Sequence, residues 1–204
     1  MNIVVINPNT TSAMTTRIAA TAKAVAQPGT NIIAIQPSAG PASIEGYAHE
    51  GMAVPHMLRA LFAAQKNHPA NAGGVADYVI ACFDDTGPDA ARCILNAPVV
   101  GIGEAACHMA SLLAARFSVV TTLSRSINPL EHNLAKYGLA SRCARVRAAE
   151  VAVLDLEDAA SDAYAHISNE VRFALIEDRA EAIVLWCAGM TDLAARCQKS
   201  MACQ

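Results

Sequence analysis

The sequence predicts an α/β protein with two similar lobes, each a three-layer arrangement of a mainly parallel sheet between helices. Short β-branched apolar runs alternate with stretches of helical spacing along the chain. A pattern of strand, polar turn and helix start in the first half is repeated in the second half. The chain has 204 residues, of which 53% are hydrophobic and 16% charged, so two lobes can each bury a core.

The first lobe is expected to span residues 1–98. Apolar runs that stop at turn residues predict its strands, and amphipathic spacing predicts its helices. Pro88 suits the first turn of a further helix after the third strand. We expect strands at residues 2–6, 31–35 and 78–82, and helices at residues 14–26 and 51–66.

The second lobe is expected to span residues 99–204 and to repeat this order. Its repeat of the first strand is Phe117-Ser118-Val119-Val120, which ends in Thr121-Thr122. The same patterns predict strands near residues 98–101, 117–122, 144–153 and 182–187, and helices at 104–115, 127–137, 159–176 and from 191 onward.

One predicted strand in each lobe ends in a cysteine. Cys82 follows Val79-Ile80-Ala81, and Cys187 follows Val184-Leu185-Trp186. A turn, a helix start and a threonine four residues on follow each thiol. A single cysteine in such a place is more often a small packed residue, but its repetition favours a chemical role.

Two thiols that face each other could invert a carbon centre without a cofactor. We expect the lobes to be related by a rough two-fold axis, with the active site in the cleft between them. One thiolate would remove a proton α to a carbonyl, and the opposite thiol would protonate the other face. A free thiol has a pKa of about 8.5, which a helix N-terminus lowers. The polar loops after the strands would stabilise the developing oxyanion.

Charge and hydropathy favour small metabolites as partners. The net charge is −3 without a basic cluster, which argues against nucleic acid or a membrane surface. No apolar run approaches the roughly 18 residues of a membrane span, and the N-terminus lacks a signal-peptide layout. We therefore expect a cytoplasmic protein whose seven cysteines are reduced.

A pair of glycines follows one predicted strand, as in nucleotide-binding motifs. The segment Gly101-Ile102-Gly103-Glu104-Ala105-Ala106 matches the dinucleotide fingerprint, but no carboxylate follows about 20 residues later. We reject nucleotide binding, and we expect these glycines to let the next helix pack close to its strand.

Five segments together resemble the hydantoin and allantoin racemases of the aspartate/glutamate racemase superfamily, in order over nearly the whole chain. They are Asn7-Pro8-Asn9-Thr10-Thr11, Gly40 to Gly46, Ala81 to Gly87, Phe117 to Thr122 and Cys187 to Met190. The resemblance implies acid/base roles for Cys82 and Cys187, no metal or pyridoxal phosphate, and a homo-oligomer. It also implies substrate contacts at Asn9, Thr10, Thr11, Pro41, Ile44, Phe83, Asp84, Thr86, Thr121, Thr122, Ala188, Gly189 and Met190.

The chain departs from the family pattern in two places. Trp186 stands directly before the second cysteine, where the family usually has a glycine. The sequence ends at Gln204, whereas the family continues with one more strand and helix. The first departure would narrow the pocket or shift the second thiol, and the second would leave the family's return strand and helix absent.

Several alternatives stay open at this point. The substrate is a 5-monosubstituted hydantoin or allantoin, and a related decarboxylase would need only one cleft cysteine. Six scattered histidines do not form a metal site, whereas a Cys-His hydrolase would use one thiol and leave the repetition unexplained. An inactive binding protein of the same fold is the rival from another class.

Three further cysteines are interpreted as packing residues: Cys93, Cys107 and Cys143.

Overall fold

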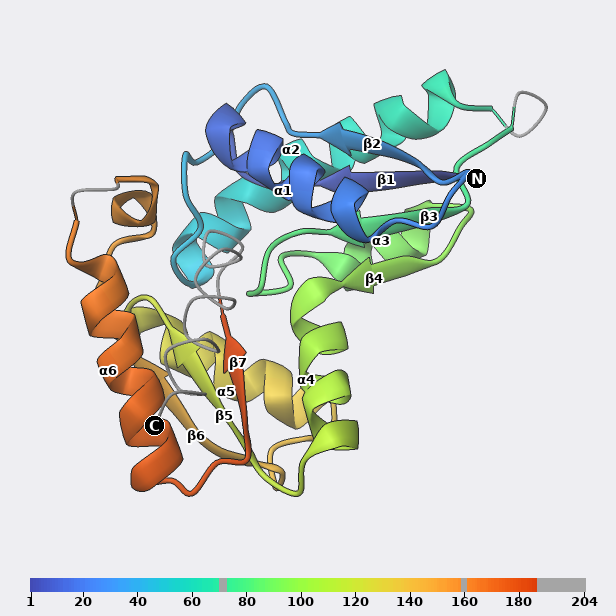
Figure 1. Ribbon diagram of the computed structural model, residues 1–204. Helices are drawn as coiled ribbons and strands as arrows, with labels where there is room; N and C mark the ends of the chain where they lie inside the picture. The colour runs from blue at the N-terminus through green and yellow to red at the C-terminus, as the bar shows by residue number, and fades with distance from the viewer. Residues whose placement is uncertain (70–72, 159–160, 187–204) are drawn as a thin grey trace. The chain divides into compact units, whose positions relative to one another are not determined.

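The computed structural model describes residues 1–69, 73–158 and 161–186. By its internal contacts the chain divides into two compact units, Met1–Ile102 (unit 1) and Gly103–Gln204 (unit 2). Each unit contains a parallel sheet with helices on its faces (Figure 1). The predicted α/β class with mainly parallel sheets is therefore confirmed.

Unit 1 has a four-stranded parallel sheet in the order β2-β1-β3-β4. Helix α1 covers one face and α2 the opposite face (Figure 1). The strands are β1 (Asn2–Ile6), β2 (Asn31–Ile35), β3 (Asp77–Ile80) and β4 (Val99–Gly101), and the helices are α1 (Ser12–Val25), α2 (Tyr47–Asn67) and α3 (Pro88–Ile94).

The core of unit 1 lies between the sheet and α2. Continuous β-branched strands suit a parallel sheet that is buried on both faces. Val4 pairs with Ile33 on one side and with Tyr78 on the other. Met57 and Leu61 of α2 are completely buried against these strands.

Unit 2 has a three-stranded parallel sheet in the order β6-β5-β7. The sheet lies between α5 and α6 (Figure 1). Its elements are α4 (Ile102–Leu113), β5 (Phe117–Thr121), η2 (Ser124–Ser126), α5 (Ile127–Lys136), β6 (Cys143–Ala148), η3 (Val153–Glu157), α6 (Ala163–Ile176) and β7 (Ala182–Leu185).

The structure differs from the expected elements at several boundaries. β4 pairs with β3, so the strand expected to open the second lobe belongs to the first sheet. The strand expected to reach residue 153 ends at Ala148, because Glu150 adopts a left-handed conformation with φ of 54°. Helix α2 begins earlier than expected, at Tyr47, directly after Gly46 with φ of 94°. The helix expected from residue 191 lies outside the described residues.

Within residues 1–69, 73–158 and 161–186, no helix is both long enough and apolar enough to cross a membrane.

Candidate active site

The polar residues of unit 1 gather at the switch point of its sheet. After β1 the chain crosses toward β2 on one side, and after β3 it crosses toward β4 on the other. In open parallel sheets, ligands bind where the loops at the carboxyl ends of two neighbouring strands part in this way. The loop from Asn7 to Thr11 and the turn from Cys82 to Thr86 follow these two strands.

Cys82 stands two residues after the last residue of β3. The Ala81 amide donates to the Ile6 carbonyl oxygen at 2.8 Å, which extends the pairing of β3 with β1 to the residue before the thiol. The Cys82 side chain is half-buried, and the Thr86 hydroxyl donates a hydrogen bond to its sulfur at 3.4 Å. The strand pairing therefore determines where the thiol lies.

The turn after Cys82 is held from two sides. The Asp85 amide donates to the Cys82 carbonyl oxygen at 3.1 Å, and Asp85 adopts φ of 47°, a left-handed conformation that aspartate tolerates. A Cβ atom on Gly101 would stand 2.6 Å from the Asp85 Cγ. We expected Gly101 to give room to a helix, but the structure shows that it gives room to this carboxylate.

Asn7 and Asn9 form a network at the end of β1. The Asn7 side-chain amide donates to the Asn9 Oδ1 and the Thr15 Oγ1, both at 2.9 Å. The Asn9 Oδ1 also accepts a hydrogen bond from the Thr11 amide at 2.9 Å. Asn7 is 1% exposed and Asn9 is 5% exposed. Asn7 was not predicted as a site residue, although an amide directly after a buried strand was a signal for this role.

The two long loops of unit 1 are joined by hydrogen bonds. The Thr10 amide donates to the Pro41 carbonyl oxygen at 3.0 Å, and the Thr11 hydroxyl donates to the Ala42 carbonyl oxygen at 2.6 Å. Ile44, further along the same loop, is buried. The structure thus brings together the segments around Asn9 and Pro41, which the sequence predicted as substrate contacts. Phe83 and Asp84 lie in the turn after Cys82, where Asp84 is buried.

In unit 2, buried threonines follow β5, and the strand pairing continues past β7. Thr121 and Thr122 are almost completely buried, and their carbonyl oxygens each accept a hydrogen bond at 3.0 Å from Ala149 and Val151. The Trp186 amide donates to the Val120 carbonyl oxygen at 2.8 Å, so the strand pairing reaches Trp186. The remaining predicted site residues of this unit lie outside the described residues: Cys187, Ala188, Gly189 and Met190.

The other described cysteines differ in their surroundings. Cys107 is buried, in agreement with a packing role. Burial raises the pKa of the Cys143 thiol to about 11, so this group stays protonated near neutral pH. The interpretation as a packing residue is wrong for Cys93, which is exposed on the short helix α3.

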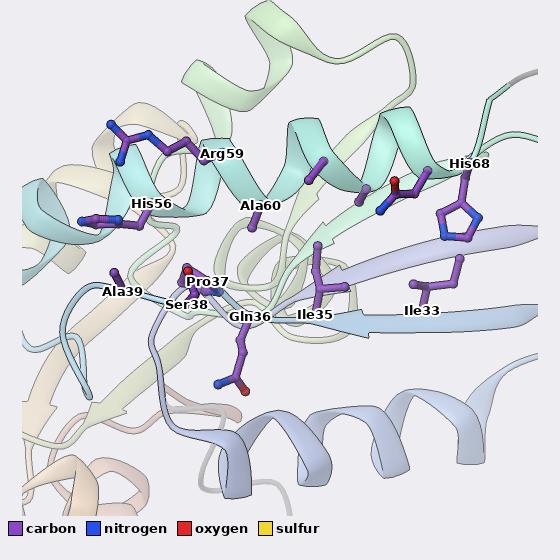
Figure 2. Close-up of a pocket in the computed structure, with 13 residues that line it drawn as sticks. Ile33, Ile35, Gln36, Pro37, Ser38, Ala39, His56, Arg59, Ala60 and His68 are labelled. Atoms are coloured by element: carbon purple, nitrogen blue, oxygen red, sulfur yellow. The ribbon is translucent and has the colours of Figure 1, made fainter.

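A hollow of about 530 Å³ lies elsewhere, along the outer edge of the sheet of unit 1. Figure 2 shows that α2 lines one side of it, whereas β2 and the residues after it line the other. His56 and His68 stand near its two ends, with small alanine side chains between them. Because neither Cys82 nor the turn after it lines this hollow, we place the candidate active site at the switch point.

Comparison with known proteins identifies the family. A family model described as Asp/Glu/Hydantoin racemase matches residues 3–204. A hydantoin racemase from Rhizobium meliloti is 44% identical over 200 residues, which cover 98% of this chain and 80% of that protein. One from Pseudomonas sp. (strain NS671) is 42% identical over 201 residues, covering 98% and 78%.

A solved structure agrees with these sequence matches. The structure of an allantoin racemase from Klebsiella pneumoniae superposes with a TM-score of 0.92 at 43% identity, covering 99% of this chain and 80% of that chain. The family resemblance inferred from the sequence is confirmed. The chain therefore belongs to the Asp/Glu/hydantoin racemase family.

Proposed function

We propose that this racemase inverts the ring carbon of 5-monosubstituted hydantoins with two thiols, Cys82 and Cys187, and without a cofactor. The observation that carries this proposal is the position of Cys82 at the carboxyl end of β3, beside the polar loop that follows β1. In sequence, Cys187 follows the corresponding strand of unit 2. Two positioned acid/base groups meet the requirement for inversion through a planar intermediate.

The proposed reaction moves one proton onto the ring carbon and one off it. The thiolate of one cysteine takes the proton from the ring carbon, and the electron pair moves into the neighbouring carbonyl as an enolate. The thiol of the other cysteine then donates its proton to the opposite face. After one turnover the two cysteines have exchanged protonation states, and the reverse reaction restores them.

The polar loops would bind the ring and its developing oxyanion. Ring amide and carbonyl groups need donors and acceptors at fixed positions, and the joined loops of unit 1 offer backbone groups of both kinds. We propose substrate contacts at Asn9, Thr10, Thr11, Pro41, Ile44, Phe83, Asp84, Thr121, Thr122, Ala188, Gly189 and Met190. The homo-oligomeric state and the cytoplasmic location expected from the sequence stay predictions.

Allantoin is the second candidate substrate. It contains the same ring with a ureido group on the reacting carbon, so the same two thiols could act on it. The similarity to the allantoin racemase structure, with its TM-score of 0.92, favours testing it beside the hydantoins.

The experiment is to follow the optical rotation of single enantiomers in D₂O. The substrates are 5-benzylhydantoin, 5-methylhydantoin and allantoin, each measured beside a control without protein because these rings racemise slowly unaided. We expect decay faster than the control and deuterium on the ring carbon, and the fastest substrate identifies the preferred class. Folded protein that gives neither decay nor exchange would contradict the proposal and favour an inactive binding protein.

A further inference from the structure

Thr86 lies in the turn that follows Cys82, and its side chain is completely buried. Its hydroxyl donates a hydrogen bond to the Cys82 sulfur, with Oγ1 and Sγ 3.4 Å apart. Among the residues that the structure describes, this hydroxyl makes no other hydrogen bond. Burying a hydroxyl without an acceptor costs free energy of folding. At this position the Cys82 sulfur is the acceptor for the Thr86 hydroxyl.

The backbone around Thr86 keeps the hydroxyl aimed at the sulfur. On the N-terminal side, the Asp85 amide closes the turn onto the Cys82 carbonyl oxygen. On the C-terminal side, Gly87 has φ of 69°, and a Cβ atom there would stand 3.0 Å from side-chain atoms of Val54 and Met57 on α2. Thr86 therefore lies between Asp85, whose amide is hydrogen-bonded to Cys82, and Gly87, which lies close to side chains of α2.

We infer that Thr86, which the family resemblance implies as a substrate contact, is instead a positioning residue that holds the Cys82 sulfur and favours its thiolate form. This inference rests on the proposed acid/base role of Cys82. A hydrogen bond donated to the charged form of a group stabilises that form, and a thiolate is the form that accepts a proton. While the hydroxyl is bonded to the sulfur, it is not available to a substrate oxygen.

Other ionisable groups stand on the elements around the turn. β1 and β4, which flank β3, contain no ionisable side chain. The ionisable groups on the turn, on α3 and on the first half of α2 are Asp84, Asp85, Asp89, Arg92, Cys93, Tyr47, His49, Glu50 and His56. A comparison of variants at position 86 leaves all of these groups in place, so it isolates the contribution of the hydroxyl.

The test is the pH dependence of Cys82 alkylation by iodoacetamide, with the modified peptide identified by mass spectrometry. Thr86→Val removes the donor and keeps the shape of the side chain, whereas Thr86→Ser keeps the donor. We expect Thr86→Val to raise the midpoint of Cys82 alkylation by about one pH unit. Thr86→Ser should restore the wild-type midpoint.

The controls separate this effect from general damage. Thr16→Val makes the same substitution on the exposed surface of α1 and should leave the Cys82 midpoint unchanged. Alkylation of exposed Cys93, read from the same digests, should be the same in every variant. Thr86→Ala removes the hydroxyl without placing a second methyl beside the sulfur, and it replaces Thr86→Val if that variant does not fold.

The outcomes distinguish this inference from the proposed function. An unchanged Cys82 midpoint in folded Thr86→Val or Thr86→Ala would overturn the inference, as would a raised midpoint in Thr86→Ser. The measurement needs no turnover, so it reports on Thr86 even if no substrate is racemised. A raised midpoint together with absent racemisation would support the link from Thr86 to the thiolate and would count against the proposed function alone.

Discussion

The two units share a strand order and a strand-end pairing but differ in the side-chain contacts around their sheets. β2-β1-β3 in unit 1 corresponds to β6-β5-β7 in unit 2. The Ala81 amide bonds to the Ile6 carbonyl oxygen, and the Trp186 amide bonds in the same way to that of Val120. Ala81 and Trp186 therefore occupy corresponding positions, each directly before a cysteine in the sequence, and one small and one large side chain are accommodated there.

The difference continues in the groups around each sheet. In unit 1 the amide of Asn7 and the loop from Pro41 hold the end of β1. In unit 2 the buried Arg147 of β6 donates to Asp178 at 2.7 Å and to Glu177 at 2.7 Å, and Ser118 of β5 also donates to Asp178. The backbone pairing at the strand end is therefore common to both units, whereas the side-chain contacts around each sheet differ.

The largest effect should come from the two cysteines. We expect Cys82→Ala and Cys187→Ala each to lower the racemisation rate by about 10²–10⁴-fold, because each removes one of two acid/base groups. The rate is measured by polarimetry, and circular dichroism checks the fold. Equal losses would show that the two units contribute equally, and near wild-type rates in both variants would refute the two-thiol mechanism.

The next effect concerns the residue before each cysteine. Trp186 is 2% exposed, so we expect Trp186→Ala to lower the free energy of unfolding by about 3–5 kcal/mol. The matched change in unit 1, Ala81→Gly, removes one methyl group and should cost about 1 kcal/mol or less. Urea denaturation measures both. A loss below that of Ala81→Gly would show that the indole does not stabilise unit 2.

The charged cluster of unit 2 makes a prediction about pH. Hydrogen bonds from Arg147 hold the pKa of Asp178 below its usual value. A lowered folded-state pKa stabilises the protein above the unfolded-state pKa, and this contribution is lost as the pH falls through the folded-state pKa. We expect Asp178→Asn to cost about 2–3 kcal/mol at neutral pH.

The difference in the free energy of unfolding between wild type and Asp178→Asn should therefore become smaller at acidic pH. Urea denaturation at neutral pH and at several values below pH 4 measures it. A gap that stays constant over this range would show that the Asp178 charge does not stabilise unit 2. The matched control is Asp89→Asn in unit 1, whose carboxylate is exposed beside Arg92 and should contribute little.

The smallest effect concerns the turn of unit 1. Gly101→Ala would push a methyl group into the Asp85 carboxylate, so we expect a loss of about 1–3 kcal/mol in the free energy of unfolding. Gly51→Ala on α2, where a Cβ atom meets nothing within 4 Å, is the control and should not destabilise the protein. Equal stability of both variants would show that the turn adapts freely.

Much of the fold was predictable because buried parallel strands are short, continuous and β-branched. The runs at Ile3 to Ile6 and Phe117 to Val120 show this pattern, and both form the central strand of a sheet. Element ends were less predictable where a single residue changes the backbone direction. Glu150, in a left-handed conformation, ends a segment whose apolar pattern continues to Val153.

The candidate site was predictable in its segments but not in its contacts. Polar residues after buried strands indicated the loops at Asn9 and Thr121 and the turn at Cys82. The placement of the Asp85 carboxylate against Gly101 joins the turn after β3 to the last residue of β4, and no local pattern encodes such a contact. The bond from Thr86 to the sulfur depends on the turn geometry, although the threonine four residues after each thiol was visible in the sequence.

The proposed mechanism requires that each cysteine acts on one face of the same carbon. Its most direct test is deuterium incorporation from D₂O into each separate enantiomer of the preferred substrate by Cys82→Ala and Cys187→Ala. A variant with one remaining thiolate can remove and return a proton on one face only. We predict that each variant exchanges one enantiomer without inverting it, and that the two variants select opposite enantiomers. Exchange of both enantiomers by either variant, above the rate without protein, would contradict the two-thiol mechanism.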